Sequence, residues 1–329
     1  MFARRLLAAG FVIALALTAP SNRLAAAAAC HCPDRHDAYV REGYIPVEGG
    51  RVWYRIVGNG PGTPLLLLHG GPGAPSYYLE SLAVLADERP VIFYDQLGAG
   101  RSDRPNDPRL WTVRRFTREL AQVRTALHLR RVHLLGHSWG AQLAVEHALT
   151  GATGIRSMTL AGPSLSLPLW LKAAARLRMQ LPASVRATLA RSEKAGTTAS
   201  KAYQDAVNVY YGKHLSLTNP PPSAAVNTNA NFGEQVYATM WGPSEFYATG
   251  SLKTYDVTSR LHELRMPVLF TCGRFDEATP AMVASFQRLV PHARLAVFEH
   301  SAHLTMIDEP VHYASTVRAF LHDADAQPR

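Results

Sequence analysis

The chain of 329 residues is poor in cysteine, with three, and in lysine, which supplies five of its 34 basic residues. Three cysteines do not make a disulfide framework, and no set of Cys and His residues in the sequence has zinc-site spacing. The formal net charge is +9, yet the basic residues are scattered, with no run longer than pairs such as Arg114–Arg115. Nucleic-acid binders concentrate such residues in a stripe, so we expect no nucleic-acid partner.

Long apolar runs are also scarce, and the main one lies near the start of the chain. Arg4 and Arg5 precede an apolar stretch over 6–19, which is shorter than the roughly 20 residues of a membrane helix. Small residues follow at 25–29. This pattern predicts a signal peptide over 1–29, and hence a periplasmic or secreted protein without a stable membrane span. A lipid anchor at Cys30 and an uncleaved N-terminal anchor are the alternatives.

Short apolar runs alternate with helical patterns along most of the remaining sequence. Strands are predicted at 44–47, 52–57, 64–69, 91–94, 132–135, 158–161, 268–272 and 295–298. Helices are predicted at 77–86, 116–127, 142–149, 169–180, 185–194, 281–289 and 311–321. Such alternation predicts an α/β fold with a mostly parallel central sheet.

The strand pattern is interrupted over about 90 residues, a length beyond an ordinary loop. We therefore expect a core made of residues 38–162 and 252–329, and a helical cap made of residues 163–251. A Pro- and Asn-rich segment within the cap, 219–231, carries no predicted element.

A candidate nucleophile follows the strand predicted at 132–135. Gly136-His137-Ser138-Trp139-Gly140 fits the pattern G-x-S-x-G and stands between a strand and a helix. Glycines on both sides of the serine allow the tight, strained turn that exposes its hydroxyl. The pattern therefore predicts that Ser138 is a nucleophile.

A serine hydroxyl needs a base, and that base needs a group to orient it. His303 stands in the loop after the last predicted strand, with His300 as its competitor, and Asp276 follows the penultimate strand. The order Ser138, Asp276, His303 is typical of α/β-hydrolases. Cys272 ends an apolar run and is predicted to be buried.

Several motifs together resemble the proline iminopeptidase family of α/β-hydrolase serine aminopeptidases. They are His69–Gly73, Asp95–Ser102, Gly136–Gly140, Met240–Phe246 and Asp276–Pro280. The resemblance spans about residues 40 to 325 and implies an α/β-hydrolase fold. Segment 219–231 has no counterpart that we can place.

The resemblance also implies roles for particular residues. Gly71 and Trp139 would supply backbone N–H groups to an oxyanion. Glu245 and Glu277 would bind the protonated amine at a peptide's N-terminus, because charge-assisted hydrogen bonds to carboxylates are strong. Asp95 has no chemical part in this scheme and is expected to brace its glycine-rich turn.

A prolyl ring needs an apolar slot. Candidates for its walls are Trp241, Phe246 and Trp139, with Tyr210 and Tyr211 as weaker ones.

The expected activity is release of an N-terminal residue, preferably proline, from a small peptide or aminoacyl amide, with no metal or cofactor. Two alternatives stay open. One is an esterase, lactonase or amino-acid amidase with the same Ser-His-Asp arrangement, and the other is a non-catalytic, ligand-binding relative. The sequence does not determine the oligomeric state.

Overall fold

The computed structural model describes residues 39–327, which are built around an eight-stranded sheet with the order β1-β2-β4-β3-β5-β6-β7-β8. β1 pairs antiparallel with β2, and β2 antiparallel with β4. The pairings from β4 through β3 and β5 to β8 are parallel. The strands are β1 Val40–Val47, β2 Gly50–Val57, β3 Leu65–Leu68, β4 Val91–Tyr94, β5 Val132–His137, β6 Ile155–Ala161, β7 Val268–Gly273 and β8 Arg294–Phe298.

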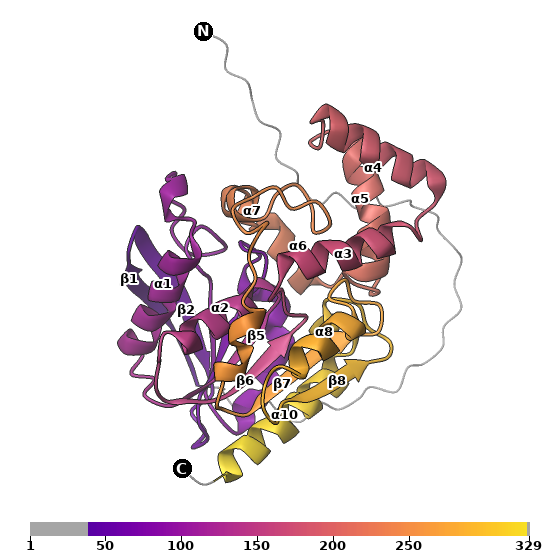
Figure 1. The fold of residues 1–329 in the computed structure, drawn as a ribbon. Coiled ribbons are helices and arrows are strands. Elements are labelled where there is room, and N and C mark those ends of the chain that lie inside the picture. The colour runs from indigo at the N-terminus through magenta and orange to yellow at the C-terminus, as the bar shows by residue number, and fades with distance from the viewer. Residues whose placement is uncertain (1–38, 328–329) are drawn as a thin grey trace, which may run out of the picture.

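Ten α-helices and three 3₁₀ helices lie within the described residues. The α-helices are α1 Val113–Ala126, α2 Trp139–Leu149, α3 Leu167–Arg178, α4 Ala183–Ala195, α5 Lys201–His214, α6 Ser223–Ala230, α7 Glu234–Met240, α8 Pro280–Gln287, α9 Thr305–Asp308 and α10 Pro310–Ala326. The 3₁₀ helices are η1 Ser76–Asp87, η2 Pro108–Leu110 and η3 Thr258–Glu263. Figure 1 shows α3 to α7 gathered at one end of the sheet, away from the C-terminus.

The central strands are buried along their length, which is why they are continuously apolar. All four residues of β3 are fully buried, as are those of β4. One apolar cluster joins the sheet to α1, α2 and α8, and a second joins it to η1 and α10. Burial of both faces is the arrangement that a parallel sheet requires. The predicted α/β-hydrolase fold, with its mostly parallel sheet, is confirmed.

The segment predicted as a helix at 77–86 is a 3₁₀ helix, η1, rather than a helix of 3.6-residue period. Ser76, Leu79, Leu82 and Leu85 are buried at every third position. A 3₁₀ helix has three residues per turn, so this spacing places all four side chains on one side.

The interval between β6 and β7 contains more helix than the sequence indicated. Helices α5, α6 and α7 were not predicted, and α6 lies inside the Pro- and Asn-rich segment. Thr228 is the only buried residue of α6, so this helix lacks the apolar stripe that sequence patterns detect. The division into core and cap at residues 163 and 251 stays a prediction.

The predictions for residues 1–29 and Cys30 fall outside the described residues. Among residues 39–327, no helix is long and apolar enough to cross a membrane. Cys272 is buried, as predicted.

Candidate active site

Ser138 occupies the turn between β5 and α2 with a positive φ of 55° and a ψ of −116°, a backbone conformation that residues other than glycine rarely adopt. Its N–H donates to the carbonyl oxygen of Ala161 over 2.8 Å. A Cβ on Gly136 would lie 2.2 Å from Gly140 O, and one on Gly140 would lie 2.0 Å from Leu68 O. Only glycine fits at these two positions, and the strained turn holds Ser138 at the carboxyl ends of the strands.

His303 and Asp276 form a buried pair beside this turn. Nδ1 of His303 lies 2.7 Å from Oδ1 of Asp276, which also accepts the Ala278 N–H over 2.6 Å. Gly162 has a φ of +48°, and a Cβ there would lie 2.7 Å from His303 Nδ1. The glycine therefore lets the pair approach the end of β6. His300, the competing candidate, is exposed.

The loop that carries Gly71 lies against the nucleophile turn. A Cβ on Gly70 would be 3.2 Å from the Ser138 Cβ, and Gly71 itself has a φ of +105°. Trp139 is the first residue of α2, so its N–H has no partner within that helix. Both candidate oxyanion residues thus lie beside Ser138. Trp139 follows it in the chain, and Gly71 is in the loop that packs against the turn.

The indole of Trp139 points into the core rather than toward the cap. Its Nε1 donates to Gln96 Oε1 over 2.8 Å, and its ring packs edge-on against Phe116 with centroids 5.7 Å apart. The ring therefore lies apart from the cap aromatics described below.

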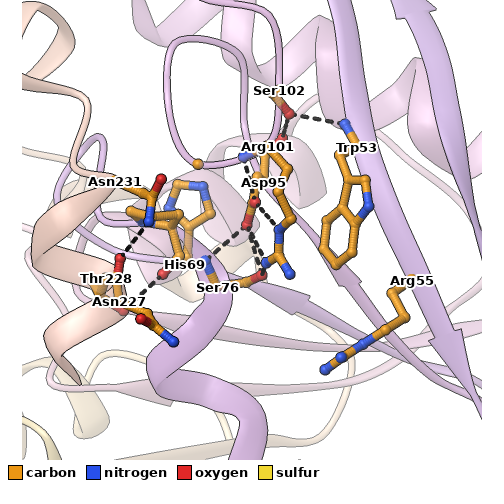
Figure 2. Close-up of polar contacts among 12 residues, drawn as sticks. Trp53, Arg55, His69, Ser76, Asp95, Arg101, Ser102, Asn227, Thr228 and Asn231 are labelled. Atoms are coloured by element: carbon orange, nitrogen blue, oxygen red, sulfur yellow. Dashed lines mark hydrogen bonds and ion pairs between the residues drawn. The ribbon is translucent and has the colours of Figure 1, made fainter. Parts of the chain in front are cut away.

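Asp95 braces the second glycine-rich loop, as Figure 2 shows. Its Oδ1 accepts the N–H and hydroxyl of Ser76 over 2.9 and 2.7 Å, and its Oδ2 accepts Nε of Arg101 over 2.7 Å. The Arg101 guanidinium lies over the Trp53 ring, 3.4 Å from its centroid. Burial raises the pKa of Asp95, but the hydrogen bonds and charge of Arg101 outweigh it and hold the pKa below its ordinary value. The carboxylate is fully committed to this structural network.

Residues 231–233, here called the clasp, connect the cap to both glycine-rich loops. The Gly233 N–H donates to Gly73 O over 2.8 Å, and the Gly100 N–H donates to Asn231 O over 3.0 Å. A Cβ on Gly73 would lie 2.7 Å from Gly233 O. The clasp follows α6 directly and begins at Asn231, the last residue of the segment that the sequence left unplaced; Gly233, two residues further on, holds the loop of Gly71.

Glu277 is fully buried and Glu245 is half-buried, and both carboxylates lie near the His303–Asp276 pair. Tyr237 donates its hydroxyl to Glu245 Oε1 over 2.8 Å. Within the described residues, Glu245 Oε2 and both carboxylate oxygens of Glu277 lack a hydrogen-bond partner. The Tyr210 hydroxyl approaches Glu277 without a hydrogen bond of good geometry. Buried carboxylate oxygens normally find hydrogen-bond partners, so these two acids leave three accepting positions open.

The charges of this site are coupled. Burial raises the pKa of Glu245 to about 7, opposed by the charge of His303 and the Tyr237 hydrogen bond. Burial also raises the pKa of Glu277 well above its ordinary value, and the charges of Glu245 and Asp276 add to this. Burial lowers the pKa of His303, but Asp276 and then Glu245 outweigh it, so the net shift is upward. The two glutamates therefore resist being ionised together, and each raises the cost of ionising the other.

Aromatic side chains surround the acids. Trp241 is fully buried and packs edge-on against Trp170, with centroids 5.4 Å apart. Phe246 packs against Tyr210 at 4.7 Å, and Tyr211 lies 6.5 Å from Phe246. The predicted wall residues other than Trp139 thus lie in two aromatic groups, and Glu245 stands in the chain segment between Trp241 and Phe246.

Trp170 was missed by sequence reasoning. Its Nε1 donates to Glu245 O over 2.8 Å, and its ring packs edge-on against His303 at 5.6 Å. It therefore connects the backbone of one acid to the imidazole. A single tryptophan at the start of a cap helix belongs to no motif, so only the fold reveals it.

Within residues 39–327, no three His, Cys, Asp or Glu side chains are placed to hold a metal ion together.

The sheet order and the strand–turn–helix around Ser138 are those of an α/β hydrolase, and the family model of the alpha/beta hydrolase fold matches residues 63–310. The proline iminopeptidase of Heyndrickxia coagulans is 46% identical over 284 residues, 85% of this chain and 98% of that protein. The solved proline iminopeptidase of Mycobacterium smegmatis has a TM-score of 0.80 and 36% identity, over 87% of this chain and 99% of that one. VinJ has a TM-score of 0.82 and 35% identity, over 86% and 99%. The chain belongs to the proline iminopeptidase family, which confirms the resemblance seen in the motifs.

Proposed function

We propose that this protein is an exported serine aminopeptidase that releases an N-terminal residue, preferably proline, from small peptides or aminoacyl amides. The observation that carries the proposal is the pair of glutamates with three buried, unpaired oxygens beside a buried His–Asp pair. An esterase has no use for two acids next to an uncharged ester. A cationic amine satisfies both the charge and the open hydrogen-bonding positions.

The reaction proceeds through an acyl-enzyme. The Ser138 hydroxyl oxygen attacks the carbonyl carbon of the first residue, and Nε2 of His303 accepts the hydroxyl proton. Asp276 holds the imidazole through Nδ1 and stabilises the imidazolium. The N–H groups of Gly71 and Trp139 hold the oxyanion. His303 then protonates the leaving amine as the C–N bond breaks. Water, activated by His303, hydrolyses the acyl-serine and regenerates the hydroxyl.

Substrate recognition is assigned to the cap together with Glu277 of the core. The ring nitrogen of an N-terminal proline is a secondary ammonium with two N–H donors, which match one acceptor on Glu245 and one on Glu277. Trp241 and Phe246 provide apolar walls for the ring. A bound cation also lowers the repulsion between the two acids, so binding favours the doubly ionised pair.

A kinetic panel tests this assignment. The wild type should hydrolyse a proline arylamide, and N-acetylation of that substrate should lower kcat/KM by about 10²-fold or more, because it removes the charge. Ser138→Ala should lower kcat by at least about 10³-fold with the melting temperature retained. Equal turnover of free and acetylated substrates would favour the esterase or amidase alternatives. A failure to label with a serine-reactive phosphonate would favour the non-catalytic alternative.

Export is the second part of the proposal and is supported by the sequence pattern of residues 1–29 alone. Expression of the full chain in a bacterial host, followed by fractionation and mass measurement of the N-terminus, tests it. A mature chain in the periplasm or medium supports cleavage, and a lipid-modified Cys30 supports the anchored alternative. An intact chain in the cytoplasm would contradict export.

A further inference from the structure

Tyr78 and His137 are buried side chains next to the candidate site that the reaction scheme above does not use. Tyr78 lies on η1, and His137 immediately precedes Ser138. The Gly70 N–H donates to the Tyr78 hydroxyl oxygen over 2.8 Å. The same hydroxyl lies 2.8 Å from Nδ1 of His137, and Nε2 of His137 lies 3.1 Å from the carbonyl oxygen of His303. A continuous chain of hydrogen bonds therefore links three loops.

The direction of each hydrogen bond in this chain is fixed by its ends. The carbonyl oxygen of His303 only accepts, so Nε2 of His137 carries the proton and donates. Nδ1 is then bare and accepts the Tyr78 O–H, whose oxygen in turn accepts the Gly70 N–H. A neutral His137 is required. Burial holds the pKa of His137 well below its ordinary value, with a further contribution from the charge of His303.

The chain connects the parts of the backbone whose relative positions the reaction depends on. Gly70 precedes Gly71 in the candidate oxyanion loop, His137 precedes Ser138, and the last acceptor is the backbone of His303 itself. The imidazole rings of His137 and His303 also pack together, with centroids 4.5 Å apart. Errors of about 1 Å in such positions cost on the order of 10²-fold in rate.

We propose that Tyr78 and His137 are positioning residues, which set the oxyanion loop and the His303 loop relative to Ser138. They act through Gly70 and His303 and do not contact the substrate. The inference rests on the serine-hydrolase chemistry of the proposed function, but not on its preference for proline.

The first test is Tyr78→Phe, which removes one hydroxyl and keeps the ring. We expect kcat to fall about 10- to 100-fold with KM changed less than about twofold, on both a proline arylamide and a simple aryl ester. Labelling of Ser138 by a phosphonate should slow in parallel. Tyr94→Phe is the matched control, because Tyr94 is fully buried and its hydroxyl has no partner within the described residues. This control should retain wild-type kcat.

A second pair of variants separates positioning from packing. In His137→Gln, the amide oxygen can accept from Tyr78 and the amide nitrogen can donate to His303. We therefore expect His137→Gln to keep most of the wild-type kcat, and His137→Leu to lose it. If His137 only filled space in the core, both variants would lose stability and their kcat values would not differ in this way. The pair also decides the matter if Tyr78→Phe does not fold.

The outcomes distinguish this inference from the proposed function. If the wild type labels with phosphonate and hydrolyses the ester but not the arylamide, the aminopeptidase proposal fails while the positioning test still applies. If Tyr78→Phe and His137→Leu both label at the wild-type rate, the positioning role is overturned.

Discussion

Glu245 and Glu277 are acidic side chains at positions where ionisation is unfavourable to the folded protein. Neither residue has a basic partner among the described hydrogen bonds and ion pairs, and three of their four oxygens are unpaired. Such groups cost free energy in the folded state, because their lost hydration is not replaced. Such a cost is retained where a ligand relieves it, and under the proposed function that ligand is the amine of the substrate.

Substitution of one acid should separate amine recognition from acyl transfer. Glu245→Gln keeps an oxygen for Tyr237 but removes the charge, so kcat/KM for a proline arylamide should fall about 10²-fold. Hydrolysis of a neutral aryl ester should change by less than about threefold. Glu146→Gln is the matched control, because Glu146 likewise accepts a tyrosine hydroxyl, from Tyr255 over 2.8 Å, outside the site. Equal losses on both substrates would argue against amine binding by Glu245.

At the residue scale, the sequence reveals the candidate catalytic residues that belong to a motif. Ser138, Asp276 and His303 stand in a fixed order after recognisable strands, so a motif search finds them. Trp170, Tyr237 and Tyr78 are ordinary aromatic residues, and their partners lie 75, 8 and 59 residues away in the chain. Only the folded backbone shows what they contact.

The clasp joins the cap to the loop that carries the candidate oxyanion residue Gly71. Its Gly233 N–H binds Gly73 O, two residues beyond Gly71. The same segment leads into α7, whose Tyr237 binds Glu245. One short stretch of chain therefore connects the acid assigned to the amine with the loop assigned to the oxyanion.

Gly73→Ala should disturb this connection. A Cβ at Gly73 would lie 2.7 Å from Gly233 O, so the clasp or the loop must shift, and we expect kcat to fall about 10-fold or more. Gly151→Ala is the control: Gly151 has a comparable φ of +84°, against +102° at Gly73, but a Cβ there meets nothing within 4 Å. Both variants bear the backbone strain of a left-handed alanine, about 1 kcal/mol, and only Gly73→Ala bears the clash. Similar kcat values for the two variants would refute the role of the clasp.

Among the secondary-structure elements, the sheet was predictable and much of the cap was not. β3 and β4 are short, continuously buried and apolar, so their composition alone indicates central strands. α6 is held instead by tertiary contacts. In one of them the Thr228 hydroxyl accepts the Tyr78 N–H over 3.1 Å. Helices fixed by tertiary hydrogen bonds leave little periodic signal in the sequence.

For the molecule as a whole, the buried acids make stability depend on pH. The pKa of Glu277 is raised in the folded state, so below its ordinary value of about 4.5 both the folded and unfolded chains hold the proton and ionisation of the group takes nothing from stability. As the pH rises above that value, the unfolded chain releases the proton first. Stability is therefore lost progressively until the pH passes the raised, folded-state pKa.

Glu277→Gln should remove this loss, because an amide does not titrate. The melting temperature of the variant minus that of the wild type should be larger at pH 8 than at pH 5, by about 2 °C or more.

Glu263→Gln provides a surface control. Glu263 is exposed, and its pKa is lowered by the hydrogen bond and charge of Arg260, so its removal should give a small difference of the opposite sign. Calorimetry at both pH values measures these differences. A Glu277→Gln difference that is equal at the two pH values, or larger at pH 5, would show that Glu277 ionises in the folded protein as easily as in the unfolded chain. The buried acid pair could then not act as a strained receptor for a cation.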